Sequence, residues 1–258
     1  MNHLVIAVSA DSSLELLGKY ADVIVLDKEP LPAQLKSYES VYIRSHFSTP
    51  ELSPENFRAE IEILVEQAKA QNQAVTFVDG METVDAIVRF EDKWLQYVKF
   101  SEFMPSTVLL DSSNKVAELT RPIYKKRLSS RGNGVTWNSN EVAGEPEGWI
   151  AQESLTIAEE MRVYVINGEA YPVGALRYSM TNEQKAQAID SRHLSVDEIE
   201  FATKVGKKAP GLDMIGLDIA RTADGELLLL EVNRSPGFGA FANITDVNLA
   251  DALYKDSA

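Results

Sequence analysis

Two acidic side chains lie on either side of a short turn in the segment LDIARTADGELLLLEVN, residues 217–233. The pair Asp224-Gly225 between two apolar runs predicts a two-residue β-hairpin turn, because both residues tolerate a positive φ. Counted outward from that turn, Asp218 lies directly opposite Glu231. This position is predicted to be a non-hydrogen-bonded pair, in which the Cβ atoms are about 4.5–5.5 Å apart. The sequence therefore predicts two carboxylates that face each other.

A third oxygen donor joins this carboxylate pair. Asn233 follows Glu231 by two residues, so it projects from the same face of the strand. Two facing carboxylates in an apolar hairpin are unfavourable without a compensating cation, and an oxygen set of Asp, Glu and Asn suits Mg²⁺. Asp218, Glu231 and Asn233 are therefore candidate metal ligands. The alternative is a structural pair at a sheet edge, neutralised by lysine, arginine or water.

A basic segment that contains glycine, PIYKKRLSSRGNGV (122–135), could bind an anion. Its small residues, with Gly132 and Gly134, would let backbone N–H groups approach a phosphate. The spacing differs from that of a P-loop, and a solvated turn is the alternative interpretation. Four cationic residues stand within seven positions: Lys125, Lys126, Arg127 and Arg131.

The chain as a whole is acidic. Its 25 Lys and Arg residues against 39 Asp and Glu residues give a net charge of −14. Such a surface repels phosphate backbones, so we expect no nucleic-acid partner, and a polyanion site needs a local basic patch. The absence of cysteine excludes disulfides and thiolate metal sites. We find no signal peptide and no apolar stretch of 18 residues, so we expect a cytoplasmic protein without membrane contact.

The first third of the chain, residues 1–85, predicts a small parallel α/β domain. Continuous apolar strands are typical of a sheet buried on both faces. A long amphipathic helix is expected at about 54–71, and the absence of G-x-G-x-x-G argues against a dinucleotide site. The strands are expected at 4–9, 22–27, 41–45 and 74–80.

Residues 86–258 have a different pattern, which predicts an antiparallel α+β domain. Hairpins with alternating side chains are separated by helical stretches. The predicted elements are a helix at about 83–100, a hairpin within 161–179, a helix near 195–208 and a second hairpin within 214–233.

Six segments, taken in order along the chain, resemble the ATP-grasp superfamily, and within it most closely the RimK-like group of ribosomal protein S6 glutamate ligases. The resemblance covers roughly residues 90–250 and implies an ATP-grasp fold preceded by the parallel domain. The segments are EDK (91–93), YKKRLSSRGNGV (124–135), AQESL (151–155), MRVYVING (161–168), LDIAR (217–221) and EVNRSPGF (231–238).

The resemblance implies a nucleotide site at defined positions. Lys93 and Lys125 match the lysines that contact the ATP phosphates, and Gly132 and Gly134 belong to the glycine loop. Glu153 and Leu155 match the hinge whose backbone reads the adenine edge. Each residue has an ordinary alternative, because Lys93 could be a solvated helix residue and Gln152 and Glu153 exposed strand residues.

The remaining matches concern catalysis and the metal. Arg162 corresponds to an arginine that faces the γ-phosphate or the developing acyl phosphate, although an outward arginine is also common in a strand such as MRVYV. Asp218, Glu231 and Asn233 match the metal ligands, in agreement with the hairpin, and Asn233 also belongs to the nucleotide site. Mn²⁺ would suit the same ligands as Mg²⁺.

The chain departs from the family pattern in two places. Arg234 replaces a small residue beside the metal ligands, and residues 177–195 lack the R-S-N-hydrophobic-H-R stretch near the acceptor. Glutamate and ribosomal protein S6 are therefore not implied as substrates. Arg44, which follows a predicted strand, is a further candidate for contact with substrate.

The function implied is an ATP- and Mg²⁺-dependent ligase that joins a carboxylate to an amine through an acyl phosphate, with Arg162 and Lys125 as catalytic residues. The partners expected are small-molecule or peptide substrates, and a homo-oligomer is left open. Two alternatives keep the same nucleotide residues. One is an ATP-grasp kinase or phosphotransferase, and the other is a regulatory protein that binds nucleotide without ligation.

Overall fold

The structure is a computed structural model, and it describes residues 2–7, 10–25, 38–44, 54–71, 76–77, 84–110, 115–129, 134–142, 144, 146–177 and 188–254. Four residues of the predicted phosphate segment 122–135 lie outside these ranges, namely Ser130, Arg131, Gly132 and Asn133. No helix in the described ranges is long and apolar enough to cross a membrane.

The N-terminal part is the parallel α/β unit that the sequence predicts. Its sheet has the order β2-β1-β3-β4, and all three neighbouring pairs are parallel. Alternate residues of β1 enter two separate cores, with Leu4 and Ile6 on one side and Val5 and Ala7 on the other. The elements are β1 (His3–Ala7), α1 (Leu14–Leu17), β2 (Asp22–Val25), β3 (Ser40–Arg44), α2 (Pro54–Gln71) and β4 (Thr76–Phe77).

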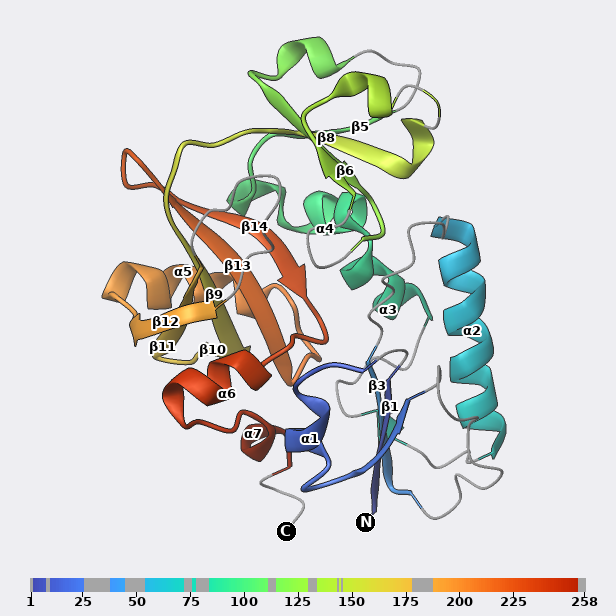
Figure 1. Cartoon of the computed structure of the whole chain (residues 1–258). Helices are drawn as coiled ribbons and strands as arrows, with labels where there is room; N and C mark the ends of the chain where they lie inside the picture. Colours follow the sequence, from blue (N-terminus) through green and yellow to red (C-terminus); the bar gives the residue numbers. More distant parts are fainter. Residues whose placement is uncertain are drawn as a thin grey trace.

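Two helices connect this unit to the rest of the chain. Helices α3 (Val84–Glu91) and α4 (Lys93–Phe100) follow one another, and the short helix η1 (Ser101–Phe103) ends the run. In Figure 1, α4 lies below the small upper sheet and beside β14. The predicted domain boundary between residues 85 and 86 falls within α3 and stays a prediction.

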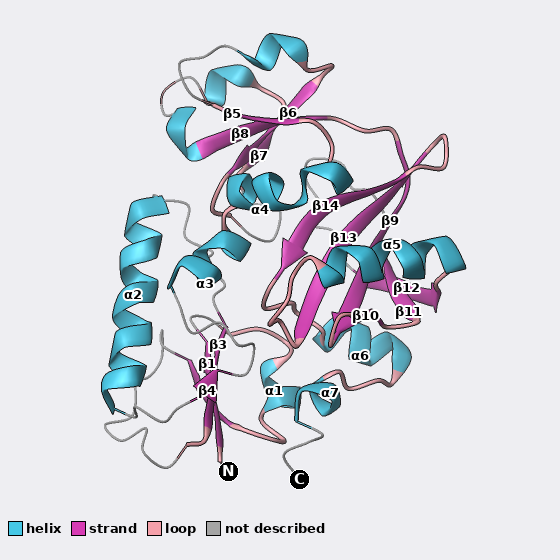
Figure 2. Ribbon diagram, turned by 180° about the vertical axis from the view of Figure 1, so that it is seen from behind, coloured by secondary structure: helices cyan, strands magenta, loops and turns pink. Residues whose placement is uncertain are grey.

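A small antiparallel sheet forms the upper part of the molecule in Figures 1 and 2. Its order is β5-β8-β6-β7, and Tyr124, Trp149 and Ala151 pack in its core. The strands are β5 (Thr107–Leu109), β6 (Pro122–Lys126), β7 (Val135–Thr136) and β8 (Trp149–Glu153), with the short helices η2 (Lys115–Glu118), η3 (Ser139–Glu141) and η4 (Pro146–Gly148) between them.

A larger antiparallel sheet forms the centre of the molecule, in the order β12-β11-β9-β13-β14, with β10 also paired to β9. Helix α5 covers one of its faces, as Figure 2 shows from behind. The elements are β9 (Ile157–Ile166), β10 (Glu169–Ala170), β11 (Val173–Arg177), β12 (Ala188–His193), α5 (Val196–Lys207), β13 (Met214–Thr222), β14 (Leu227–Asn233), α6 (Gly239–Thr245) and α7 (Ala250–Tyr254).

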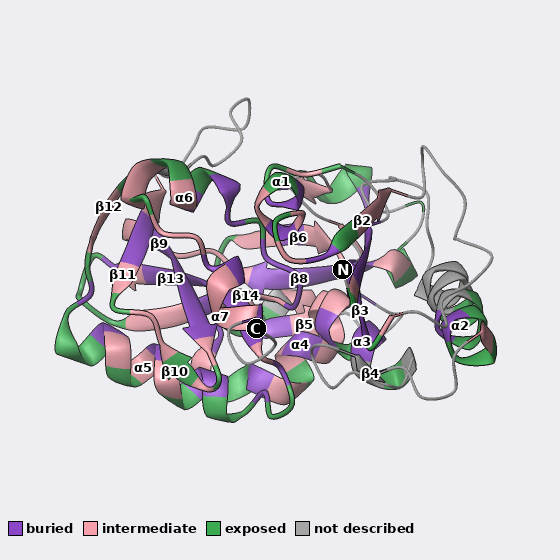
Figure 3. Cartoon of the chain, turned by 90° about the horizontal axis from the view of Figure 1, so that it is seen from below, coloured by how far each residue is buried: buried purple, intermediate pink, exposed green. Residues whose placement is uncertain are grey.

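The two faces of the large sheet differ in character because side chains alternate along each strand. Met161, Val163 and Leu217 point to one face and join the core beneath α5, together with Ala202 and Val205 of that helix. The central strands are buried, whereas the outer surface of α5 is exposed (Figure 3). The opposite face carries charged side chains, and we call it the polar face.

Candidate active site

The hairpin of β13 and β14 has the predicted pairing but not the predicted turn. Thr222 N donates to Glu226 O at 2.9 Å, so the loop has three residues, and Gly225 adopts φ +92° in it. This shifts the register by one residue relative to a two-residue turn. A β-bulge next to Ile219, at Leu230, shifts it back.

The bulge decides which face Glu231 occupies. On the side of the bulge nearer the turn, Ile219 pairs with Leu229. On the far side, Asp218 pairs with Glu231, as predicted. Without the extra residue Leu230, a turn of three residues would send Glu231 to the apolar face, because a slip of one residue exchanges the faces of a strand. Pairing of Asp218 with Glu231 is therefore confirmed, while the two-residue turn is wrong.

Six charged or amide side chains share the polar face of the large sheet. Directly paired residues point to the same face, and Asp218 pairs with both Arg162 and Glu231. Arg177 pairs with Glu160, and Gly216 with Asn233. The set is Glu160, Arg162, Arg177, Asp218, Glu231 and Asn233.

Asp218 lies at the centre of this set and is 6 % exposed. Arg162 binds it through two parallel hydrogen bonds, from Nε to Oδ1 and from Nη2 to Oδ2, the second at 2.8 Å. Arg177 Nη1 lies 3.0 Å from Oδ1, and Asn233 Nδ2 lies 3.5 Å from Oδ2. Burial acts to raise the pKa of Asp218, but the charges and hydrogen bonds of the two arginines hold it at about 2.

Two members of the set, Glu160 and Arg177, were not identified from the sequence. Arg177 Nη1 lies 3.6 Å from Glu160 Oε1 as well as close to Asp218. Burial, and then the charge of Asp218, raise the pKa of Glu160. The strand pattern held a signal for Glu160, which precedes Arg162 by two residues. The sequence contained no such signal for Arg177, because its position beside Glu160 depends on the pairing of β11 with β9.

Glu231 is paired with Lys93, one of the two lysines predicted to contact phosphate. Lys93 Nζ lies 3.2 Å from Glu231 Oε1 and donates to Ser129 O at 2.5 Å. Lys93 is the first residue of α4. That helix is capped by Asp92, whose carboxylate accepts from Trp94 N at 2.8 Å. The cap fixes where the helix begins and thereby where Lys93 is placed.

Lys125, the second predicted phosphate lysine, projects from β6 of the small sheet. Its Nζ donates to Gln152 Oε1 at 2.7 Å. Burial lowers the pKa of Lys125, the charge of Lys93 acts in the same direction, and the charges of Glu231, Glu160 and Asp218 act against both. The side chain therefore lies between the small sheet and the polar face of the large one.

Gly134 is the described glycine of the predicted phosphate loop. It has φ +65°, and an added Cβ would lie 2.8–2.9 Å from the side chain of Lys126. Its carbonyl accepts from Lys126 N at 2.8 Å. A side chain at this position would therefore be strained and would push against β6, which carries Lys125.

The predicted hinge residues lie where the small sheet passes into the large one. Glu153 ends β8, and its N–H donates to Ser106 O at 2.8 Å. Leu155 is half-buried in the short link 154–156 that leads into β9 (Figure 1). Contact of either residue with adenine stays a prediction.

The oxygen donors of the polar face fit a hard divalent cation by their chemistry. Asp218, Glu231 and Asn233 lie on adjacent strands and offer two carboxylates and an amide. Within the residues that the structure describes, no group of three or more His, Cys, Asp or Glu side chains could hold a metal ion. Because Lys93, Arg162 and Arg177 already bind both carboxylates, a cation there would have to replace some of these contacts and take further oxygens from phosphates.

Arg44, the candidate for substrate contact, and Arg234, which follows the metal-ligand candidate Asn233, both connect parts of the fold. Arg44 is 0 % and Arg234 1 % exposed. Arg44 Nη2 donates to Asp11 Oδ2 at 3.0 Å and to Pro236 O at 3.1 Å, while Arg234 Nη2 donates to Ile43 O at 2.6 Å. Both link the N-terminal sheet to the segment after β14.

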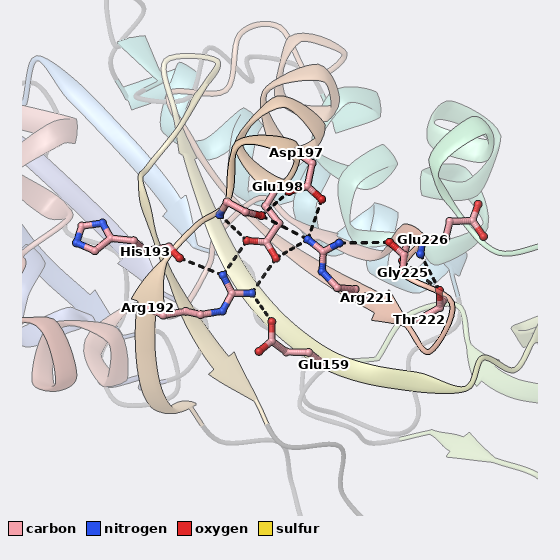
Figure 4. Close-up of polar contacts among 10 residues, drawn as sticks. Glu159, Arg192, His193, Asp197, Glu198, Arg221, Thr222, Gly225 and Glu226 are labelled. Carbon is pink, nitrogen blue, oxygen red and sulfur yellow. Dashed lines mark hydrogen bonds and ion pairs between the residues drawn. The ribbon is translucent and has the colours of Figure 1, made fainter.

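A second charged network connects helix α5 to the large sheet (Figure 4). Glu198 of α5 accepts from Arg192 of β12 at 2.7 Å and 2.8 Å and from Arg221 of β13 at 2.8 Å. Arg192 also pairs with Glu159 of β9. The hydrogen bonds of Arg192 and Arg221 hold the pKa of Glu198 well below its usual range despite burial. This network fastens α5 to three strands.

Curated proteins of similar sequence are named as probable glutamate ligases. A probable alpha-L-glutamate ligase from Parasynechococcus marenigrum (strain WH8102) is 27 % identical over 206 residues, which are 69 % of this chain and 43 % of that protein. The probable alpha-L-glutamate ligase 2 of Hahella chejuensis (strain KCTC 2396) is 28 % identical over 149 residues, 51 % of this chain and 47 % of that protein. The chain thus spans less than half the length of these curated relatives.

Solved structures have the same fold. The ATP-grasp ligase PsnB, complexed with a phosphomimetic variant of a minimal precursor, Mg and ADP, has a TM-score of 0.69 at 19 % identity, covering 100 % of this chain and 99 % of that one. D-cycloserine synthetase DcsG has a TM-score of 0.68 at 14 % identity, covering 99 % and 100 %. The ATP-grasp fold expected from the six segments is confirmed. Residues 54–253 also match the model of a family described as an ATP-grasp domain, clade family 3. The chain therefore belongs to that ATP-grasp family.

Proposed function

We propose that this chain is an ATP- and Mg²⁺-dependent ligase that joins a carboxylate to an amine. One observation carries the proposal. In a chain with a net charge of −14, four cationic side chains gather around the carboxylates Asp218 and Glu231. A local excess of positive charge beside oxygen ligands suits a polyphosphate with its divalent cation. The four are Lys93, Lys125, Arg162 and Arg177.

Each of these residues would have a role that follows from its position. Lys93 and Lys125 lie toward β14 and the small sheet, and they would hold the phosphate chain of ATP. Asp218, Glu231 and Asn233 would hold Mg²⁺, which neutralises charge on the phosphate oxygens. Arg162 would offset the charge that develops on the transferring phosphoryl group.

The reaction needs no nucleophile from the protein. An oxygen of the substrate carboxylate bonds to the γ-phosphorus as the bond to ADP breaks, giving an acyl phosphate. The nitrogen of the amine then bonds to the acyl carbon, the phosphate leaves, and the nitrogen gives up a proton to yield an amide. The matched relatives are named as probable glutamate ligases, and PsnB is a ligase complexed with a precursor. Amino acids and peptides are therefore the first substrates to try.

The test is a product screen with ATP, Mg²⁺ and pools of amino acids and peptides. A ligase releases ADP and free phosphate and gives a product whose mass equals the two substrates minus water. A phosphorylated product without free phosphate would instead identify a kinase, and absence of ADP formation with every pool would contradict both activities.

A binding measurement complements the screen. Mg²⁺-ATP should raise the melting temperature of the protein by ligand linkage. Lys125→Ala should largely abolish this shift, whereas Lys204→Ala, on the exposed side of α5, should leave it unchanged. A full shift in Lys125→Ala would exclude that lysine from the nucleotide site.

A further inference from the structure

A chain of three hydrogen bonds leads from a backbone carbonyl to Lys125. Pro105 O accepts from Thr107 Oγ1 at 2.9 Å, and Thr107 Oγ1 accepts from Gln152 Nε2 at 2.9 Å. Gln152 Oε1 then accepts from Lys125 Nζ at 2.7 Å. We call Thr107 and Gln152, with these bonds, the lysine relay.

The direction of the relay is fixed by its first member. A carbonyl oxygen can only accept, so the single hydroxyl proton of Thr107 is committed to Pro105 O. The hydroxyl oxygen can then only accept from Gln152, which must present its amide nitrogen to Thr107. As a result the amide oxygen of Gln152 points to Lys125, and the orientation of this side chain follows from the network.

The sheet places the three side chains on one face. Thr107 of β5 pairs with Gln152 of β8, which in turn pairs with Ile123 of β6. Lys125 lies two residues beyond Ile123 and therefore shares the face. Gln152 is 2 % and Thr107 5 % exposed. A buried amide that lost its partners would cost free energy, so the relay keeps a single arrangement.

The absence of charge on Gln152 is as important for Lys125 as the position of the amide. An aspartate or glutamate at position 152 would hold Lys125 equally well but would cancel its charge. The amide instead binds the ammonium group and leaves its charge to act on the charged groups of the polar face, among them Glu231 and Glu160. For a polyphosphate, an ammonium group that is fixed but not neutralised is the stronger ligand.

We propose that Gln152, supported by Thr107, is a positioning residue that holds the Lys125 ammonium group toward the nucleotide phosphates without neutralising it. The proposal rests on the nucleotide site of the proposed function. It differs from a purely structural role, in which Gln152 would stabilise the small sheet and affect all ligands alike. The two roles are separated by measuring binding of ATP and of adenosine, because only ATP carries phosphates.

The experiment compares Gln152→Leu and Gln152→Glu with the wild-type chain by titration calorimetry, using Mg²⁺-ATP and adenosine as probes. Gln152→Leu should weaken ATP about tenfold, the scale of one hydrogen bond to a charged group. Gln152→Glu should weaken ATP at least as much although it preserves the shape. Affinity for adenosine should stay within about twofold in both variants.

Two further comparisons test the coupling. In a Lys125→Met background, Gln152→Leu should have no additional effect on ATP, because the relay then has nothing to position. Thr107→Val, which removes the hydroxyl at nearly constant shape, should weaken ATP about threefold, and Thr107→Ser should restore it. The Thr107 pair decides the matter if Gln152→Leu does not fold.

Equal losses for ATP and adenosine, or an undiminished effect of Gln152→Leu in the Lys125→Met background, would overturn the relay alone. A wild-type chain that binds no ATP would overturn the relay together with the proposed function.

Discussion

Two positive charges contact the single negative charge of Asp218. Arg162 and Arg177 both bind it, and Asn233 adds a further donor. A cation approaching Asp218 therefore meets two guanidinium groups, which repel it. Phosphate oxygens would both attract these arginines and supply ligands to the metal. For this reason we expect the metal and the nucleotide to bind together.

Glu231 is the second carboxylate, and its role is tested by removing its charge. Glu231→Gln keeps the size and one acceptor oxygen, so ATP affinity should change little. Turnover should fall by about 10²–10³, the usual effect of losing one electrostatic contact to a developing charge. Turnover and ATP affinity are measured separately with the substrates found by the screen. Glu226→Gln, at the exposed turn of the same hairpin, is the matched control, and near-normal turnover in Glu231→Gln would refute its role as a metal ligand.

The depressed pKa of Asp218 predicts a contribution to acid stability. The pKa is about 2 in the folded chain and 3.8 in its reference state, so folding favours the ionised form. Its stabilisation is present above about pH 4 and is lost as the pH falls toward 2, a loss of about 2 kcal/mol. Urea unfolding of wild type and Asp218→Asn across this range checks it. The stability difference between them should shift by this amount, and a difference independent of pH would contradict the assignment.

Residue spacing alone predicted part of this site and missed another part. Asp218, Glu231 and Asn233 belong to one hairpin, so local counting brought them together. Arg177 is on β11, and its place beside Asp218 requires that β9 lie between β11 and β13. Such strand order is set by the packing of the whole sheet and leaves no mark in the spacing of residues.

At the scale of elements, a buried amide joins α4 to the edge of the large sheet. Gln96 Nε2 donates to Val232 O at 2.9 Å and to Phe90 O at 2.8 Å, and Gln96 Oε1 accepts from Val232 N at 2.8 Å. The side chain thus takes the place of a neighbouring strand at Val232. Because Lys93 begins α4 and Glu231 precedes Val232, this contact also fixes the two elements that bring Lys93 to Glu231.

Gln96→Leu would remove this hydrogen-bond partner from three buried backbone groups. We expect the free energy of unfolding to fall by about 1–3 kcal/mol. Gln67→Leu, on the exposed side of α2, should change it by no more than about 0.5 kcal/mol. Urea denaturation measures both. Equal stability of the two variants would mean that the bonds of Gln96 contribute nothing net.

The hairpin illustrates what local signals can and cannot predict about elements. Asp224-Gly225 correctly marked the turn, because glycine accepts the positive φ found there. The length of the loop and the bulge at Leu230 could not be derived, since each changes the register by one residue and the two changes cancel. The pairing of Asp218 with Glu231 was therefore predicted correctly from a turn of the wrong length.

At the scale of the whole molecule, the N-terminal sheet is bound to the larger sheet through buried arginines. Arg44 reaches Pro236 O, and Arg234 reaches Ile43 O in return. Tyr42 adds a hydrogen bond to Arg234 O at 3.4 Å. The parallel unit is thus joined to the segment that directly follows Asn233, and its position is coupled to the polar face.

Arg234→Met should lower the stability of the molecule. The substitution leaves Ile43 O without this donor in a buried setting, which costs about 1–3 kcal/mol. Thermal and urea unfolding measure the loss. ATP affinity of the folded variant should stay close to that of the wild type. A variant with unchanged stability but weakened ligand binding would show instead that Arg234 acts at the site.

The difference between the face of the large sheet that packs on α5 and the polar face has a consequence for how the chain can change over evolution. Along β9, Met161 and Val163 are constrained by the requirement to fold, whereas Glu160 and Arg162 lie on the polar face, where burial and the charge of Asp218 raise the pKa of Glu160. Apolar replacements on that face would spare the fold and remove the charges on which the proposed ligase activity depends. Neighbouring residues in one strand are thus subject to two independent kinds of selection, and a lineage that abandoned the activity could keep the architecture.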